Sequence, residues 1–166
     1  MARWVPIFDH PNVLVRSGQT GLLLCVGAGL LAVTQPWSRF DAWADSGPDW
    51  LDWVSYGLLA LWLATYLWIW RTFSDLKSPW NSPKRPTKLV TTGPYGLLRN
   101  PGEVASAIGM LGFGLLIGSW PLLAAVPVWA LVIHLGCVLR EEHFFARDFA
   151  EDWEPYAKKV RRYGVV

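Results

Sequence analysis

Charged residues are absent from three long stretches of the chain, and these stretches determine the predicted architecture. No Asp, Glu, Lys or Arg occurs in residues 17–38, 53–70 or 104–139, which are 22, 18 and 36 residues long. A bilayer core of about 30 Å takes about 20 helical residues, so the longest stretch is close to two crossings. Gly118 and Pro121 lie near the middle of that stretch, where they indicate a turn.

The pattern therefore predicts an all-α, polytopic membrane protein that forms a single domain over residues 1–166. The expected spans are about 15–35, 52–71, 102–119 and 121–140. A soluble bundle of unusually apolar helices is the alternative, although buried soluble helices seldom lack charge over such lengths. A cleaved signal peptide is the competing interpretation of the first span, but no clean small-x-small site follows it.

The composition agrees with a membrane protein and excludes several other classes. Hydrophobic residues make up 52% of the chain and charged residues 17%, against about 25% charged in an average soluble domain. Two cysteines, Cys25 and Cys137, are too few for a disulfide-dense scaffold, and we interpret them as small packing residues. The net charge of +2 is too small to indicate nucleic-acid binding, so no nucleic-acid partner is expected.

The distribution of basic residues predicts the orientation in the membrane. Of the 15 Lys and Arg residues, 14 precede the first span, lie between the second and third spans, or follow the fourth. Arg39, between the first two spans, is the exception. Because basic loops stay in the cytoplasm, both termini and the loop between the second and third spans are expected there. We therefore expect the functional site on the cytoplasmic side.

Two polar segments flank the third and fourth spans. The first runs over 77–103 and ends in two short motifs, Gly93-Pro94-Tyr95 and Arg99-Asn100-Pro101; its alternative interpretation is a solvated connector. The second opens with Glu141-Glu142 at the end of the fourth span. Adjacent carboxylates are unfavourable at that depth unless a cation meets them. An ordinary solvated helix end is the alternative interpretation of this pair.

Aromatic residues follow the two glutamates at helical spacing. Phe145, Phe149, Trp153 and Tyr156 recur at intervals of four, four and three. This spacing predicts one aromatic stripe on a C-terminal helix that lies in the membrane interface.

Together, these motifs resemble those of the isoprenylcysteine carboxyl methyltransferases and membrane phospholipid N-methyltransferases, one superfamily of integral membrane methyltransferases. The resemblance covers about 84–166 and rests on the order and spacing of the motifs. Glu103 stands where the family pattern has a tyrosine, and Arg162 takes the position of its last arginine.

The resemblance implies S-adenosylmethionine as the methyl donor, bound in a site formed by the cytosolic loop and the C-terminal helix. The implied cofactor-binding residues are Gly93, Pro94, Tyr95, Arg99, Asn100, Pro101, Glu141, Glu142 and Tyr156. In this scheme the two glutamates receive the ammonium of the methyl donor and Arg99 binds its carboxylate. An aromatic ring of Tyr95, Phe145 or Trp153 would stack on the adenine.

The acceptor is expected to be a membrane lipid or a lipidated substrate, and two hypotheses remain open. A prenylcysteine carboxylate is already ionised and needs only a cation such as Arg99 or Arg162. A phosphatidylethanolamine amine must lose a proton, and Glu103 is the candidate for attracting that headgroup. A helix N-terminal acid is the alternative interpretation of Glu103. Arg99, Glu103 and Arg162 are thus the candidate catalytic residues, with the carboxyl acceptor placed first.

Two further functional classes stay open: a relative of the NADPH-dependent sterol reductases, and a non-catalytic membrane scaffold. No metal site is expected, because the three histidines are scattered. His134 precedes Glu141 by seven residues, which predicts one shared helix face. The glycines Gly109, Gly112, Gly114 and Gly118 predict close helix packing, within the chain or between chains.

Overall fold

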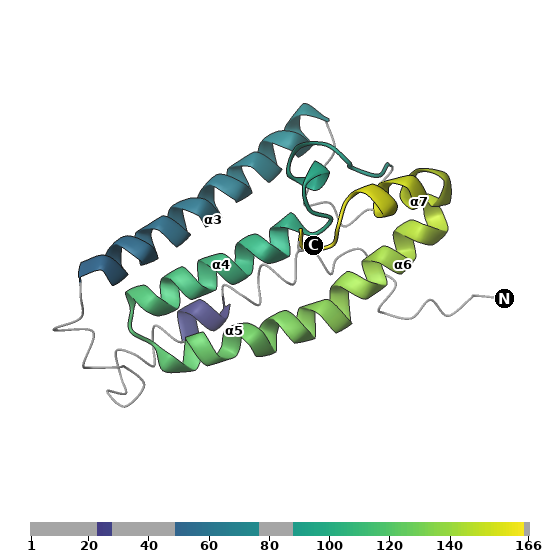
Figure 1. The fold of residues 1–166 in the computed structure, drawn as a ribbon. Helices are drawn as coiled ribbons and strands as arrows, with labels where there is room; N and C mark the ends of the chain where they lie inside the picture. The colour runs from purple at the N-terminus through teal and green to yellow at the C-terminus, as the bar shows by residue number, and fades with distance from the viewer. Residues whose placement is uncertain (1–22, 28–48, 77–87, 165–166) are drawn as a thin grey trace.

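The structure is a computed structural model that describes residues 23–27, 49–76 and 88–164, and all regular structure in these ranges is helical (Figure 1). Residues 23–27 form one short helical stretch. The other elements are α3 (Asp49–Asp75), the 3₁₀ helix η3 (Gly93–Gly96), α4 (Pro101–Leu116), α5 (Trp120–Ile133), the π-helix η4 (His134–Val138), α6 (Leu139–Asp148) and α7 (Ala150–Lys159).

Three long helical rods form the body of the molecule. The helices α5, η4 and α6 follow one another without a break, so that Trp120–Asp148 is one continuous rod of 29 residues. Helix α4 lies between α3 and this rod (Figure 1). A cluster of buried side chains joins α4 to the rod and includes Met110, Leu122 and Trp129.

Two of these rods are long and apolar enough to cross a membrane, namely Trp50–Asp75 and Trp120–Asp148. They contain the predicted second and fourth spans. The predicted third span, 102–119, corresponds to α4, an apolar helix of 16 residues that ends at Leu116. The predicted first span falls largely outside the described residues. The number of four spans and the cytoplasmic orientation therefore stay predictions.

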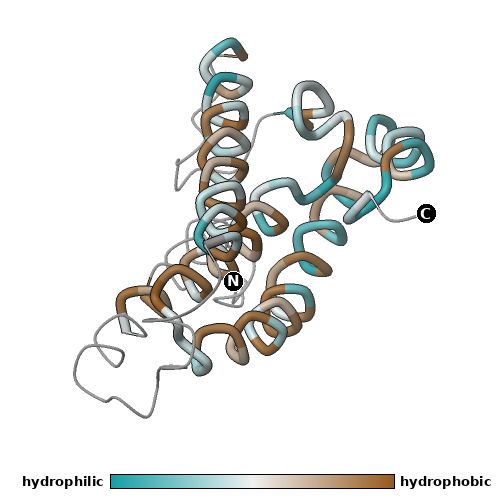
Figure 2. The backbone as a smooth tube through the Cα atoms, turned by 60° about the vertical axis from the view of Figure 1, so that its left-hand side comes forward, coloured by the Kyte–Doolittle hydropathy of each residue, from teal (hydrophilic) through white to brown (hydrophobic). Residues whose placement is uncertain are grey.

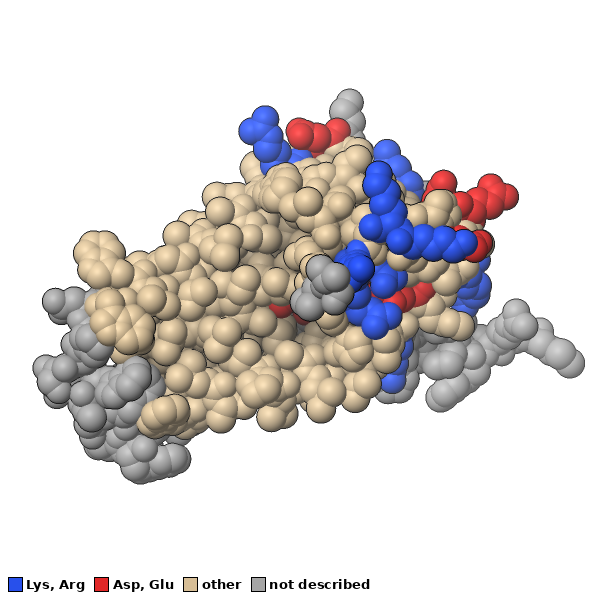
Figure 3. All heavy atoms as spheres, in the orientation of Figure 1, with Lys and Arg blue, Asp and Glu red and all other residues tan. Residues whose placement is uncertain are grey.

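The surface divides into an apolar body and a polar end. Large hydrophobic side chains are exposed along the rods, for example Trp53 on α3 and Leu131 on α5. On the face drawn in Figure 3, charged side chains gather at one end. Figure 2 shows the same division along the backbone, with hydrophilic positions concentrated around α7 and the C-terminal residues. This division is what helices in lipid with a polar surface at one end would show.

The predicted turn between the third and fourth spans is confirmed. Gly118 adopts a φ of 62°, in the left-handed region that favours glycine, directly after α4. The fully buried Ser119 then caps α5, since its Oγ accepts a hydrogen bond from the Leu122 amide at 3.4 Å. The chain therefore reverses here, and α5 returns along α4 (Figure 1).

The glycines of α4 pack against helices of the same chain. A Cβ at Gly109 would lie 2.7 Å from Trp62 Cδ1, and one at Gly112 would lie 2.9 Å from Leu58 Cβ. A Cβ at Gly114 would instead approach α5, 2.7 Å from Leu123 Cδ2. The close packing predicted for these small residues thus occurs within the chain, on both sides of α4.

We expect Gly109→Ala to lower the free energy of unfolding by about 1–3 kcal/mol, because the new methyl group forces α3 and α4 apart. Gly57→Ala is the matched control, since nothing lies within 4 Å of a Cβ there and alanine favours helix. Thermal unfolding followed by circular dichroism in detergent micelles measures both variants. Equal stability of the two would contradict the close contact between these helices.

Candidate functional site

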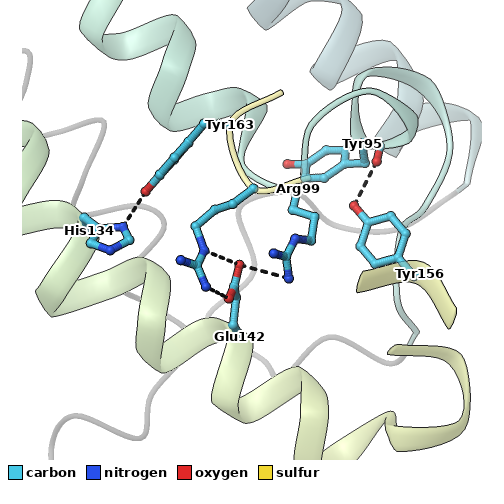
Figure 4. A network of polar contacts seen from close by, with 7 residues as sticks. Tyr95, Arg99, His134, Glu142, Tyr156 and Tyr163 are labelled. Carbon is cyan, nitrogen blue, oxygen red and sulfur yellow. Dashed lines mark hydrogen bonds and ion pairs between the residues drawn. The ribbon is translucent and has the colours of Figure 1, made fainter. Parts of the chain in front are cut away.

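The carboxylate of Glu142 lies at the centre of a network of charged side chains (Figure 4). Arg162 donates from Nε to Glu142 Oε1 at 2.8 Å and from Nη2 to Oε2, and Arg99 Nη1 lies 3.3 Å from Oε1. The Glu142 side chain is only 13% exposed, and those of Arg99 and Arg162 are 15% and 33% exposed. The hydrogen bonds to Glu142 raise the pKa of the Arg162 guanidinium above its ordinary value.

Backbone hydrogen bonds attach residues 160–164, here called the C-terminal segment, to the loop before α4. The Arg99 amide donates to the Arg161 carbonyl at 3.0 Å, and the Asn100 amide donates to the Arg162 carbonyl at 3.3 Å. Gly164 has a φ of 70°, and a Cβ there would collide with Leu98 Cδ2. The sequence predicted Arg99, Asn100 and Arg162 as site residues, and the structure brings them side by side.

The π-helix η4 changes which residues share a face of the long rod. In an α-helix, which turns by about 100° per residue, His134 and Glu141 would align. In η4 the Leu139 amide donates to the His134 carbonyl, five residues back, so the turn holds one extra residue. His134 therefore aligns with Glu142, and both point toward the C-terminal segment in Figure 4. The prediction that His134 shares a face with Glu141 is wrong for this reason.

His134 has a partner in the C-terminal segment. Its Nδ1 lies 2.7 Å from the Tyr163 hydroxyl, and the two rings are 5.8 Å apart. Tyr163 is not among the site residues that the sequence predicted. Nothing in the sequence indicates its partner, because the two residues are 29 positions apart and no motif joins them.

The aromatic stripe is divided between two helices, so the prediction of one continuous C-terminal helix is wrong. The chain bends at Phe149, which has a φ of −132° and a ψ of 38° and lies between α6 and α7. The bend lets the aromatic rings pack on one another: Phe145 stacks on Trp153 at 5.7 Å, and Trp153 contacts Tyr156 edge-on at 5.8 Å. The aromatic rings therefore contact one another across the bend, and they do not form a stripe along the face of one helix.

Trp153 also covers Arg99. The guanidinium carbon of Arg99 lies 5.4 Å from the centre of the Trp153 ring, a cation–π distance. Phe145 and Trp153, both predicted as candidates to stack on adenine, are thus in contact with each other, and Trp153 with Arg99. Arg99 is held by Glu142, by Trp153 and through its own amide, which orients it firmly.

Tyr95 and Tyr156 join the η3 loop to α7. The Tyr156 hydroxyl donates to the Tyr95 carbonyl at 2.8 Å, and the Tyr95 ring packs edge-on against Phe73 at 5.8 Å. Burial raises the pKa of Tyr156 to about 12. Burial also raises the pKa of Tyr95, and the negative charges of Glu141 and Glu103 raise it further. The two glutamates therefore lie close enough to Tyr95 to oppose ionisation of its hydroxyl.

The remaining predicted residues of the loop shape the backbone. Gly93 has a φ of 63°, and a Cβ there would collide with Thr72 Oγ1, so the glycine lets the loop lie against α3. Pro94 is buried at the start of η3, and Pro101 is buried at the start of α4, where a missing amide hydrogen is tolerated. Glu103 follows in the first turn of α4, 9% exposed.

Several buried polar atoms around Glu142 have no hydrogen-bond partner. Among the described residues these include Arg99 Nε, Asn100 Nδ2 and Glu141 Oε1. A buried polar atom left unpaired costs about 1–3 kcal/mol, so such a group is typical of a site that a polar ligand completes. The two predicted carboxylates differ here, because Glu142 is saturated by arginines while Glu141 retains an unpaired oxygen.

The unpaired atoms fit the methyl donor that the sequence implied. S-adenosylmethionine carries an ammonium, which a carboxylate oxygen such as Glu141 Oε1 can accept. It also carries a carboxylate, which N–H groups such as Arg99 Nε and Asn100 Nδ2 can bind.

Comparison with known proteins identifies the family. A sequence model described as phospholipid methyltransferase matches residues 51–152, well over half of the chain. The chain belongs to this family. The match confirms membership of the superfamily of isoprenylcysteine and phospholipid membrane methyltransferases.

Two curated relatives have names that concern metals. The chain is 29% identical over 107 residues to the nickel-cobalt-cadmium resistance protein NccN of Alcaligenes xylosoxydans xylosoxydans, covering 64% of this chain and 47% of that protein. It is 30% identical over 107 residues to the cobalt-zinc-cadmium resistance protein CzcN of Cupriavidus metallidurans, covering 64% and 46%. The chain thus spans about half the length of these relatives. No solved structure matches the chain.

We expect Glu142→Gln to destabilise the protein by roughly 2–3 kcal/mol, because two arginines lose the carboxylate between them. The partial exposure of Arg162 keeps the loss below that of a fully buried pair. Glu141→Gln is the matched control, and its stability is expected to be unchanged or higher, since a neutral amide is easier to bury. Thermal unfolding in detergent compares the two variants. A larger loss of stability in Glu141→Gln than in Glu142→Gln would contradict the central place of Glu142 in the ion network.

Proposed function

We propose that this protein is an S-adenosylmethionine-dependent methyltransferase that acts on a membrane lipid at the cytoplasmic surface. The observation that carries the proposal is the group of unpaired buried atoms on Arg99, Asn100 and Glu141, which lie around one saturated ion network. Membership of the phospholipid methyltransferase family supports the same reaction. The methyl donor supplies an activated methyl group on its sulfonium.

The residues of the chain would act by binding and orienting. Glu141 would accept the ammonium of the methyl donor, while Arg99 and Asn100 would bind its carboxylate. Glu142 would keep Arg99 in place without contacting the ligand, since its oxygens already bind two arginines. Methyl transfer is an in-line displacement, so alignment and exclusion of water are the main contributions that the protein makes.

The charges of the site favour an amine over a carboxylate as the acceptor. Arg162 binds Glu142 through two nitrogens, and Arg99 is assigned to the carboxylate of the methyl donor, so neither cation is left to aim an acceptor carboxylate. Two acidic side chains, Glu103 and Glu141, lie close enough to Tyr95 to oppose ionisation of its hydroxyl. One carboxylate would bind the ammonium of the methyl donor, and Glu103 would attract the ammonium of a phospholipid headgroup such as phosphatidylethanolamine. We therefore place the amine acceptor first and the isoprenylcysteine-like carboxyl acceptor second.

The names of the two relatives describe a phenotype, resistance to metals, and they name no reaction. Methyl transfer is the activity that we propose for the region that this chain shares with them.

We expect purified protein in detergent to transfer label from methyl-labelled S-adenosylmethionine into lipids extracted from the native membrane. Label that is stable to mild base would identify an amine acceptor, whereas base-labile label would identify a methyl ester and favour the carboxyl acceptor. Absence of transfer, together with binding of NADPH in place of the methyl donor, would overturn the proposed function and favour a reductase.

We expect Glu141→Gln to weaken binding of S-adenosylmethionine by about 10- to 150-fold, the loss of one charge-assisted hydrogen bond. Glu103→Gln should leave this affinity within about twofold and lower kcat/KM for the lipid, since Glu103 is assigned to the acceptor. Equilibrium binding of labelled S-adenosylmethionine and initial rates measure the two effects. Unchanged affinity in Glu141→Gln would contradict the role of Glu141 in binding. Binding of S-adenosylmethionine to a variant in which Arg99, Asn100 and Glu141 are all replaced would also contradict the proposed site.

A further inference from the structure

The C-terminal segment lies against Arg99 and Asn100, two of the residues that the proposed ligand must reach. Arg99 Nε, Asn100 Nδ2 and Glu141 Oε1 are buried, so a ligand can contact them only after part of the chain moves. The backbone of the segment lies directly on Arg99 and Asn100, and its Arg162 side chain lies on Glu142.

Among the contacts that hold the segment in place, three differ in strength. The first is the pair of backbone hydrogen bonds to Arg161 and Arg162, and the second is the shielded ion pair of Arg162 with Glu142. The third is the hydrogen bond between Tyr163 and His134, which lies at the exposed edge, with Tyr163 37% exposed. A single exposed hydrogen bond contributes little and breaks readily, so the segment would open first at Tyr163.

The π-helix η4 supplies the residue to which the segment is tied. Because η4 holds one extra residue, His134 aligns with Glu142 on the face toward the segment. The same face therefore carries the partners of the ion pair and of the Tyr163 hydrogen bond. Neither His134 nor Tyr163 belongs to the residues assigned above to the methyl donor or acceptor.

We propose that His134 and Tyr163 are positioning residues: their hydrogen bond holds the C-terminal segment closed over Arg99 and Asn100, and its breakage admits and releases the ligand. The identity of that ligand as S-adenosylmethionine rests on the proposed function. The closure itself does not, because it follows from contacts within the chain.

Hydrogen–deuterium exchange in the protein without ligand tests the closure directly. The amides of Arg99 and Asn100 donate to carbonyls of the segment, so they exchange with solvent only when it opens. Tyr163→Phe should speed exchange of a peptide containing both amides by about two- to tenfold, the effect of one hydrogen bond. Tyr56→Phe, which removes an exposed hydroxyl on α3, is the matched control and should leave this exchange unchanged.

A double-mutant cycle shows whether His134 and Tyr163 act through one shared hydrogen bond or affect amide exchange independently. His134→Phe alone should speed exchange of the same amides about as much as Tyr163→Phe, and the double variant no more than either. Additive effects would overturn the proposal, and so would unchanged exchange in Tyr163→Phe. Both results stand whether or not the protein binds S-adenosylmethionine.

Ligand exchange tests the link to the proposed function. Dissociation of labelled S-adenosylmethionine should be about two- to tenfold faster in Tyr163→Phe, with kcat at saturating methyl donor within twofold of the unmodified protein. A merely structural role would lower kcat and thermal stability together. Faster amide exchange with an unchanged dissociation rate would overturn the role in ligand release. If the unmodified protein does not bind S-adenosylmethionine, the proposed function fails while the amide exchange still decides the closure.

Discussion

The Glu142 carboxylate, bound by Arg99 and Arg162, joins three parts of the chain that are far apart in sequence. Arg99 comes from the loop before α4, Glu142 from the end of the longest rod and Arg162 from the C-terminal segment. A shielded carboxylate of this kind is stable only when its cations stay in place, since removing one leaves an uncompensated charge. The network therefore fixes the loop and the segment against the rod, and the unpaired atoms beside it gain their positions from that attachment.

The π-helix η4 determines which carboxylate enters the network. Without its extra residue the polar end of the rod would rotate by about 100° relative to the apolar part, because that is the rotation per residue of an α-helix. Glu142 would then leave the face that His134 shares with it. With η4 present, Glu142 faces the two arginines, and Glu141 lies near Tyr95 with an oxygen unpaired. Two adjacent and chemically identical residues thus acquire different surroundings.

The features that depend on local sequence could be predicted, and those that depend on long-range packing could not. The apolar rods and the turn at Gly118 follow from runs of residue types and from glycine geometry. The family resemblance, which rests on the order of the motifs, predicted that Arg99, Asn100 and Arg162 belong to one site. The π-turn and the bend at Phe149 carry no comparable signal, because neither His134–Val138 nor Phe149 holds a proline or a turn dipeptide. The pairing of Glu142 with arginines could not be predicted either, since two adjacent glutamates in a sequence do not reveal which of them binds a cation within the chain.

The position of the network at the end of the apolar rods suits the proposed function, in which a water-soluble methyl donor and a lipid must meet. The rods expose large apolar side chains along their length, while charged side chains gather at one end. A lipid beside such rods has its headgroup at the level of that end, where the buried polar atoms lie. Charges shielded from water interact more strongly there than they would in solution, so a few carboxylates and arginines suffice to orient both partners. The C-terminal segment lies against Arg99 and Asn100 there, so one short stretch of chain both completes the ion network and covers part of the site.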